Sequence, residues 1–385
     1  MVDGVLPGLD GKIAGLKPLL DLRVLDFTAF PPGAACTVML ADLGAEIVRV
    51  EPLAHKGNVS LVVGQVALSR AKRSMTLDLR NPASSEVLLR LAPTFDVVVE
   101  SARPGTMEAR GFGYSQAQAR NPGIIWCAIT GFGQSGPYAD HAGHDLSFVA
   151  HSGLLGALSS ELPWHPGAML AGPAGALAAV VAIQSALLQR ARSGEGAFLD
   201  ISLSEAAGWF LTSGINPLSK QPYTITATPD RRLYACADGR FVAVTCAEPR
   251  TWSVLCDGLG VSELKDTLHK AESAGPVTQA LAAIFLTQSA EHWVHSLTPT
   301  GAAIAIVNRA KEVVQDPHVG ARGSVVECAG LMVPASPVRI ASRDGQHSGT
   351  ATDAPRRVGE DTSDVLASAG FTASEIDGLD SAGIV

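Results

Sequence analysis

The sequence is poor in charged and aromatic residues. Charged residues make up 17% of the 385 residues and aromatic residues 5%, while apolar residues reach 46%. Soluble domains average about 25% charged residues, so this chain has enough apolar side chains for a large core and is not disordered. The length suffices for two domains, or for one large domain with an insertion.

Basic residues are outnumbered by acidic ones. The chain has 29 lysines and arginines against 37 aspartates and glutamates, which gives a net charge of −8. General nucleic-acid binding depends on a basic surface, so the composition argues against a nucleic-acid partner. A local cationic patch for one small anionic ligand remains open.

Patterns for metal sites, export and membrane insertion are missing. The six cysteines form no CxxC pair and no Cys/His cluster, so we expect buried thiols and no metal site. Residues 1–15 lack the basic flank and apolar run of a signal peptide. The long apolar stretch 170–188 is rich in Ala and Gly and is expected to form a buried helix. These features predict a cytoplasmic protein without a membrane segment.

Strand and helix patterns alternate through the first 200 residues. Residues 23–27 and 46–50 are predicted strands separated by a helix over 34–43, and further strands are predicted at 96–100 and 124–130. Repeated βαβ units predict a parallel sheet covered on both faces. We therefore expect an open α/β domain in this part of the chain.

The pattern changes after residue 200. Asp238-Gly239 lies between two strand-like runs, as in a hairpin, and helical segments follow it. These features predict a smaller α+β domain after the large one. The expected boundaries are 1–213 and 307–385 for the large α/β domain, 225–300 for the small domain, and 214–224 and 301–306 for linkers.

A formal GxGxxG motif is formed by Gly131, Gly133 and Gly136. A dinucleotide fingerprint needs a helix directly after the last glycine, and Pro137 prevents one here. The glycines are better explained by a loop whose backbone approaches a ligand or a neighbouring chain. No nicotinamide or flavin is implied.

Basic residues gather near predicted strand ends, where open α/β folds bind ligands. Arg70, Lys72 and Arg73 form the densest group, with Arg49 before it and Arg103 after it. Arg and Lys are the usual donors to phosphate oxygens. On the residues alone, an ordinary solvated face is the favoured alternative.

Two acidic residues each have two interpretations. Asp145 follows His144 and precedes an apolar segment, where burial could raise the pKa of its carboxyl group. An Asp at that position also stabilises a helix start by about 1 kcal/mol, and spacing alone favours such a cap. Glu248, before Pro249, has the same ambiguity.

These segments together resemble the class III CoA-transferase family (CaiB/BaiF type), which also contains the α-methylacyl-CoA racemases. The resemblance covers nearly the whole chain and is closest in pattern to the racemase branch. The matching segments include Arg23-Val-Leu-Asp26, Leu40-Ala-Asp-Leu-Gly-Ala45, Val48-Arg-Val-Glu51, Lys72-Arg-Ser74, Asp96-Val-Val-Val-Glu100, Arg103-Pro-Gly105, Gly131-Phe-Gly-Gln-Ser-Gly-Pro137, Gly143-His-Asp145, Asp316-Pro-His318 and Gly359-Glu-Asp-Thr362.

The resemblance implies an interlocked dimer. Each chain would have a large Rossmann-like domain, with its parallel sheet built from both chain ends, and a small domain. The substrate would be a CoA thioester, with no permanently bound cofactor. The residues expected to bind CoA are Arg49, Arg70, Lys72, Arg73, Arg103, Gly131, Gly133 and Gln134.

Two chemistries occur in the family. In the transferases an Asp at the position of Asp145 attacks the thioester and passes CoA between carboxylic acids. In the racemases a His with a Glu partner, matched by His144 and Glu248, exchanges the proton at C2 with a second base. That base is an Asp at the start of the following helix, where this chain reads Ala171-Gly172-Pro173.

Three functions follow from the resemblance. CoA transfer through Asp145 ranks first, because it does not need the absent Asp. Epimerisation at C2 by His144 and Glu248 ranks second. The third is a catalytically inactive subunit that pairs with an active homologue. It is motivated by the absent Asp, by Thr228–Arg232 in place of a glycine-rich loop, and by Asp361 where the family usually has His.

Overall fold

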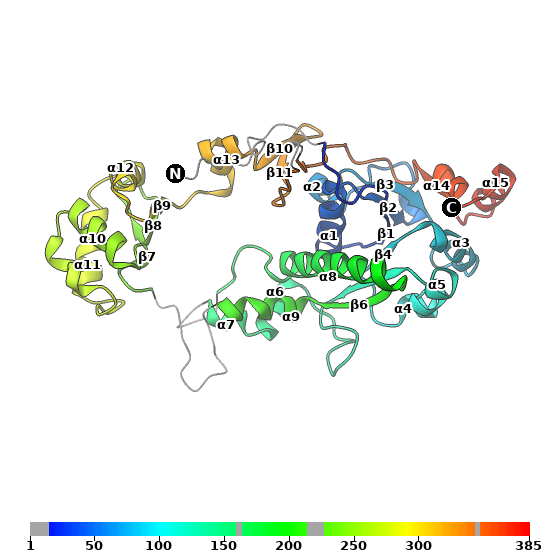
Figure 1. Cartoon of the computed structure of the whole chain (residues 1–385), viewed down its shortest axis with the longest axis horizontal. Coiled ribbons are helices and arrows are strands. Elements are labelled where there is room, and N and C mark those ends of the chain that lie inside the picture. Colours follow the sequence, from blue (N-terminus) through cyan, green and yellow to red (C-terminus); the bar gives the residue numbers. More distant parts are fainter. Residues whose placement is uncertain (1–14, 159–163, 214–226, 343–346) are drawn as a thin grey trace. The chain divides into compact units, whose positions relative to one another are not determined.

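The computed structural model describes residues 15–158, 164–213, 227–342 and 347–385 (Figure 1). Its contacts divide the chain into two compact units. Unit 1 spans Met1–Thr212 and Asp316–Val385, and unit 2 spans Ser213–Gln315. The predicted linker at 214–224 lies outside the described residues.

Unit 1 is built on a six-stranded parallel sheet with the order β3-β2-β1-β4-β5-β6. The order reverses between β1 and β4, which is the point where open α/β sheets form a crevice for ligands. The strands are β1 (Arg23–Phe27), β2 (Glu46–Glu51), β3 (Arg73–Thr76), β4 (Val97–Glu100), β5 (Ile125–Thr130) and β6 (Ala197–Ser202).

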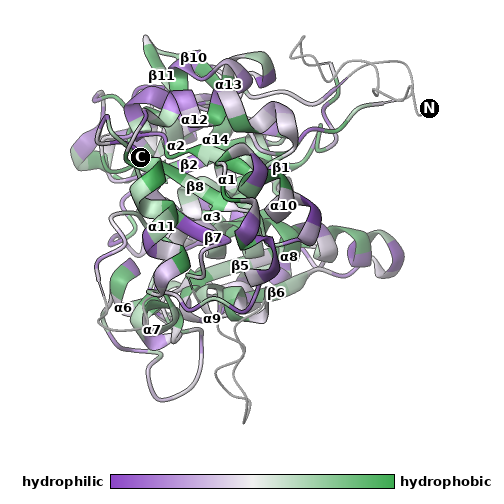
Figure 2. Ribbon diagram, turned by 90° about the vertical axis from the view of Figure 1, so that its left-hand side faces the viewer, coloured by the Kyte–Doolittle hydropathy of each residue, from purple (hydrophilic) through white to green (hydrophobic). Residues whose placement is uncertain are grey.

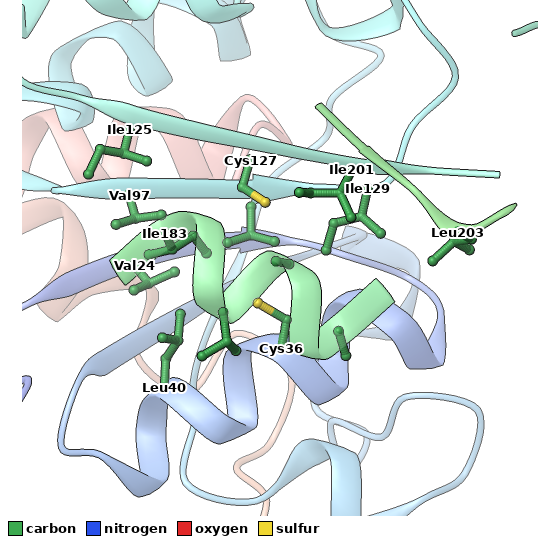
Figure 3. Packing of buried hydrophobic residues seen from close by; sticks show 14 of the residues in the cluster. Val24, Cys36, Leu40, Val97, Ile125, Cys127, Ile129, Ile183, Ile201 and Leu203 are labelled. Atoms are coloured by element: carbon green, nitrogen blue, oxygen red, sulfur yellow. The ribbon is translucent and has the colours of Figure 1, made fainter. Parts of the chain in front are cut away.

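Apolar cores cover both faces of this sheet, because neighbouring residues of a strand point to opposite faces. Val97 and Val99 of β4 belong to one core and Val98 to the other. Helices α1 (Pro31–Asp42) and α8 (Ala171–Ser193) pack on the first core, shown in Figure 3. Helices α3 (Ala83–Leu91), α5 (Tyr114–Arg120) and α14 (Thr362–Ser368) contribute to the second.

Unit 1 contains further short elements. They are α2 (Val66–Ser69), α4 (Thr106–Ala109), α6 (Asp145–His151), α7 (Leu154–Ala157), α9 (Leu203–Gly208), α13 (Pro317–Arg322), β10 (Val325–Cys328), β11 (Leu331–Pro334) and α15 (Ala373–Ser381), with 3-10 turns at Leu53–His55, Ala92–Thr94 and Trp209–Ser213. Among them, β10 and β11 form a separate antiparallel pair.

Helix α8 is the one described helix that is long and apolar enough to cross a membrane by length and composition. Its residues Ala171, Ala179 and Ile183 are buried in the first core of unit 1. This placement agrees with the buried helix that the sequence predicts.

The C-terminal segment returns to unit 1 without extending its sheet. The Ser74 N–H donates to Asp361 Oδ2 (2.9 Å), and the Thr76 N–H donates to Thr362 Oγ1 (3.0 Å). In the described chain, all six strands of the parallel sheet precede residue 203. The expectation that both chain ends build this sheet is therefore wrong. The tail supplies helices and side-chain acceptors to the edge strand β3.

Unit 2 contains an antiparallel sheet of β7 (Arg231–Ala235), β8 (Phe241–Thr245) and β9 (Ile304–Ile306). The predicted hairpin at Asp238-Gly239 joins β7 and β8. Strand β9 falls within the predicted linker 301–306, where Ala305 pairs with Ala243 of β8. Strand β9 has only three residues, with Ala305 exposed between two half-buried isoleucines, so its sequence pattern is too short to indicate a strand.

Amphipathic helices complete unit 2. Helices α10 and α12 each carry hydrophobic and hydrophilic residues (Figure 2), and their hydrophobic residues Leu255 and Leu297 are buried in one core. The helices are α10 (Pro249–Gly258), α11 (Pro276–Phe285) and α12 (Ala290–Leu297), with 3-10 turns at Ser262–Thr267, Thr298–Thr300 and Ala310–Gln315.

Candidate active site

Asp145 is the first residue of α6, yet its side chain caps a different helix. Its Oδ2 accepts a hydrogen bond from the Leu170 N–H (2.9 Å), and its Oδ1 accepts one from the Gly172 N–H (2.7 Å). Both donors lie at the N-terminus of α8, 25 and 27 residues further along the chain. The cap predicted from spacing therefore exists, but between two helices.

The N-terminus of α8 is a favourable place for this carboxylate. An α-helix carries roughly half a positive charge at its N-terminus, and its first amides have no partners within the helix. Helix α8 has 23 residues, and Asp145 takes two of its first N–H groups. Among the described residues, the N–H of Ala171 has no hydrogen-bond partner. A donor thus remains beside a half-buried carboxylate.

His144 lies at the junction of three segments. It is the N-cap residue of α6, its side chain is exposed, and its ring lies edge-on to that of Phe30, with centroids 6.5 Å apart. Phe30 is the N-cap residue of α1, which starts with Pro31 and Pro32. A Cβ atom added at Gly172 would lie 3.4 Å from Pro32 Cγ and from Asp145 Oδ1. The starts of α1, α6 and α8 therefore meet here.

The segment before His144 is fixed by the ring of Phe148. A Cβ atom at Gly131 would lie 2.3 Å from Phe148 Cε1, and one at Gly143 would lie 2.6 Å from the same atom. Only glycine at both positions lets the two backbones close on this buried ring. This packing positions the two residues that follow Gly143.

The glycine loop at 131–136 is anchored to β6. The Gln134 N–H donates to both oxygens of Asp200, at 3.1 and 3.0 Å. Gly133 has a φ of +87°, a conformation that favours glycine. In agreement with the sequence analysis, no described helix starts between Gly136 and α6. CoA binding by Gly131, Gly133 and Gln134 stays a prediction.

Three of the basic residues expected to bind CoA are buried in ion pairs. Arg70 bonds both oxygens of Asp42, at 2.5 and 2.9 Å. Lys72 Nζ lies 3.2 Å from Asp26 Oδ2 and donates to the Thr37 hydroxyl. Burial lowers the pKa of Lys72, against the opposing effect of Asp26.

Arg49 completes this group and bonds Glu51 (3.0 Å) and the Ser60 hydroxyl (2.9 Å). Arg49, Arg70 and Lys72 are all less than 9% exposed. All three side chains form ion pairs with acidic residues inside unit 1, so they are poorly placed to bind phosphates. The sequence could not reveal the partners of Arg70 and Lys72, because Asp42 and Asp26 are 28 and 46 residues away along the chain.

Arg73 and Arg103 are more accessible. Arg73 is half-buried and bonds Glu46 (2.7 Å) and Asp361 (3.2 Å). Arg103 is exposed after the carboxyl end of β4, next to the reversal of strand order, and forms no ion pair within the described chain. Of the predicted cations, Arg103 is the best placed for an anionic ligand.

Glu248 belongs to unit 2, whereas the residues described above belong to unit 1. It is the exposed N-cap residue of α10, and its N–H donates to the Thr251 hydroxyl (3.3 Å). This is the helix-start role considered for it. Its pairing with His144 stays a prediction.

Thiol and metal chemistry find no support in the described part of the chain. All six cysteines are buried and unpaired, and burial raises the pKa of Cys36 to about 12. No three His, Cys, Asp or Glu side chains there are grouped as metal ligands.

The groups that hold Asp145 could not be recognised in the sequence. The Leu170 and Gly172 amides have no side-chain signature, and Ala171-Gly172-Pro173 drew attention only for its missing Asp. Phe30 was also missed, although Pro31-Pro32 marks a rigid helix start. Its contact with His144 joins residues that are far apart in the chain.

The chain thus combines an open α/β fold with a carboxylate held at a helix N-terminus. A profile of CoA-transferase family III matches residues 19–362, and the chain belongs to this family. It is similar to solved structures of the family as well. A CaiB/BaiF family protein from Brucella suis superposes with a TM-score of 0.76 at 26% identity, covering 92% of this chain and 99% of that one.

Relatives in the family carry out two kinds of reaction. The α-methylacyl-CoA racemase of Homo sapiens is 31% identical over 381 residues, covering 95% of this chain and 97% of that protein. The succinyl-CoA–D-citramalate CoA-transferase of Chloroflexus aurantiacus is 31% identical over 335 residues, covering 80% and 83%. Family membership thus identifies an enzyme acting on CoA thioesters, and similarity alone does not choose between the reactions.

Proposed function

We propose that this protein transfers CoA between carboxylic acids through a covalent intermediate on Asp145. The observation that supports this proposal is the position of the Asp145 carboxylate. It is half-buried and accepts hydrogen bonds from the Leu170 and Gly172 N–H groups. Each carboxylate oxygen accepts one N–H from α8, which leaves a lone pair for attack. The two bonds orient the carboxylate before the substrate arrives, so less freedom is lost at the reaction step.

The transfer needs no redox partner. An Asp145 oxygen attacks the thioester carbonyl, the C–S bond breaks, and CoA leaves as a thiolate with a mixed anhydride on Asp145. The thiolate then attacks the Asp145 carbonyl, which releases the donor carboxylate and leaves an aspartyl-CoA thioester. The acceptor carboxylate repeats these steps in reverse order, and Asp145 is regenerated.

Each tetrahedral intermediate needs a donor for its oxyanion. The Ala171 N–H lies between the two residues that hold Asp145 and has no partner among the described residues. Ala171 itself is fully buried in unit 1, so this N–H contributes to the positive end of α8 around Asp145 and is not assigned as the oxyanion donor.

The CoA moiety would be held mainly through Arg103, because Arg73 lies at the opposite, amino end of the strands and is paired with Glu46 and Asp361. Arg103 is exposed beside the reversal of strand order, where the fold favours ligand binding. The acyl-CoA is a substrate here and not a resident cofactor. We propose a homodimer as the assembly, by resemblance to the family.

Epimerisation at C2 is the second candidate. It is favoured by similarity to α-methylacyl-CoA racemases and by the exposed His144 ring, which could take the α-proton. Asp145 would have to serve as the second base, and it follows His144 directly. An inactive subunit paired with an active homologue is the remaining alternative.

The test is mass spectrometry of the intact protein after incubation with a panel of acyl-CoA esters in deuterated water. CoA transfer predicts a covalent mass increase that maps to the peptide containing Asp145 and is absent in Asp145→Asn. Deuterium at C2 of the recovered ester without any adduct would support epimerisation. CoA binding with neither result would support the inactive subunit.

A further inference from the structure

Three large apolar side chains are exposed at the segments that meet around Asp145. Phe30 is 53% exposed, Leu146 41% and Met169 45%. Phe30 contacts the His144 ring, Leu146 follows Asp145, and Met169 precedes Leu170, whose N–H binds Asp145. Burial of a large apolar side chain is favourable, so a ligand that covers these groups gains free energy.

The same segments contain no cation. Neither residues 24–48 nor residues 121–189 include a lysine or an arginine. Lys72 reaches α1 from β3, but it is buried and paired with Asp26. A second carboxylate on an acyl group would therefore find no opposite charge on these segments, and its desolvation would be uncompensated.

We propose that Phe30 is a specificity-determining residue and forms one wall of an apolar acyl subsite. The occupant is the acyl chain of a CoA thioester derived from an aliphatic monocarboxylic acid, not a dicarboxylic one. This assignment rests on the proposed function, because it takes Asp145 as the reaction centre. Pro31 and Pro32 fix the backbone that carries Phe30, so the ring meets the chain at little cost in conformational entropy.

Measuring the affinity for acyl-CoA esters without turnover tests this subsite separately from the proposed reaction at Asp145. Dissociation constants for acetyl-, butyryl-, octanoyl- and succinyl-CoA are measured by calorimetry in the full-length Asp145→Asn background, which prevents turnover at that residue. Octanoyl-CoA is expected to bind at least about tenfold more tightly than acetyl-CoA. Succinyl-CoA is expected to bind no more tightly than butyryl-CoA.

Variants at Phe30 test whether this residue causes the preference for long aliphatic acyl chains. Phe30→Ala should weaken octanoyl-CoA binding about tenfold and acetyl-CoA binding less than about twofold. Phe30→Lys should tighten succinyl-CoA binding while weakening octanoyl-CoA binding. The matched control is Leu188→Ala, an exposed apolar position near the other end of α8, which should change neither.

Two results would overturn the proposal. One is tighter binding of succinyl-CoA than of butyryl-CoA by the protein with Phe30 intact. The other is an equal loss of affinity for all four esters in Phe30→Ala. These affinities are measured without turnover at Asp145, so a failure of the subsite proposal can be distinguished from the absence of an Asp145 adduct.

Discussion

The Gly172 N–H donates a 2.7 Å hydrogen bond to Asp145 Oδ1, so the first turn of α8 holds the residue that starts α6. A Cβ atom at position 172 would lie only 3.4 Å from that same oxygen. The family resemblance expects an acidic residue at this helix start. Here the helix start carries glycine without an acidic side chain, and its N–H binds the carboxylate supplied by α6.

Substitution of Asp145 separates its two roles. Asp145→Ala should abolish transfer and lower the free energy of unfolding by about 1 kcal/mol, because two amides of α8 lose their acceptor. Asp145→Asn keeps one carbonyl oxygen as an acceptor, so it should be more stable than Asp145→Ala yet equally inactive. Urea denaturation and transfer assays measure the two quantities. Full transfer activity in a folded Asp145→Ala would refute the nucleophile assignment.

Gly172→Asp should move the enzyme towards proton exchange. The new carboxyl group would lie beside Asp145, and two neighbouring carboxylates raise the pKa of one of them. Such a group supplies the second base that epimerisation requires, worth about 100-fold or more in rate. Solvent deuterium uptake at C2 of a 2-methylacyl-CoA measures the change. Gly172→Ala is the control, and equal uptake by both folded variants would contradict the expectation.

The buried and exposed arginines should behave differently. Arg70→Met leaves Asp42 buried without its partner and should cost about 3 kcal/mol or more in stability. Arg103→Ala should leave stability nearly unchanged and weaken CoA binding about tenfold. Thermal unfolding and calorimetry with CoA distinguish these outcomes. Arg192→Ala, at the exposed end of α8, serves as a surface control. Normal CoA affinity in Arg103→Ala would remove Arg103 from the binding site.

Glu100 should make stability depend on pH. Burial, reinforced by Glu108, raises the pKa of Glu100 to about 7, while hydrogen bonds from Ala102 and Trp126 oppose the shift. The folded state therefore retains a proton that the unfolded state releases at lower pH. This contribution is complete below the unfolded pKa of 4.5 and is lost as pH rises through about 7.

Glu100→Gln removes this titration and keeps a carbonyl acceptor for the Ala102 N–H. Relative to this variant, the wild type should lose up to about 3 kcal/mol of stability between pH 4 and pH 8. Urea denaturation at several pH values measures the difference. A constant difference between the two proteins would show that Glu100 titrates normally.

The sequence predicted the parts of the fold that follow from local pattern. The run Asp96-Val-Val-Val-Glu100 indicates a buried strand, and Asp238-Gly239 indicates a hairpin, because each signal lies within a few residues. Strand β9 was missed because a run of three residues is too short to show a periodicity. The tail was expected to return to the large domain both from its sequence pattern and from the resemblance, and its expected contribution to the parallel sheet was wrong.

The candidate site was predictable only in part. Asp145 and His144 stand out as residue types with useful chemistry. Their surroundings depend on contacts between distant residues, such as Asp145 with Gly172 and His144 with Phe30. For the basic residues, the sequence suggested a ligand-binding role that the fold does not favour. Arg70 and Lys72 resemble phosphate ligands in the sequence, and only the fold places Asp42 and Asp26 against them.

The most direct test of the central claim follows oxygen through Asp145. In the proposed mechanism the acceptor carboxylate gives one oxygen to Asp145, which passes it to the next donor acid. After many turnovers with an ¹⁸O-labelled acceptor carboxylate, the peptide containing Asp145 should gain mass from ¹⁸O, and the released donor acid should carry the label. CoA transfer without any ¹⁸O in that peptide would contradict the account.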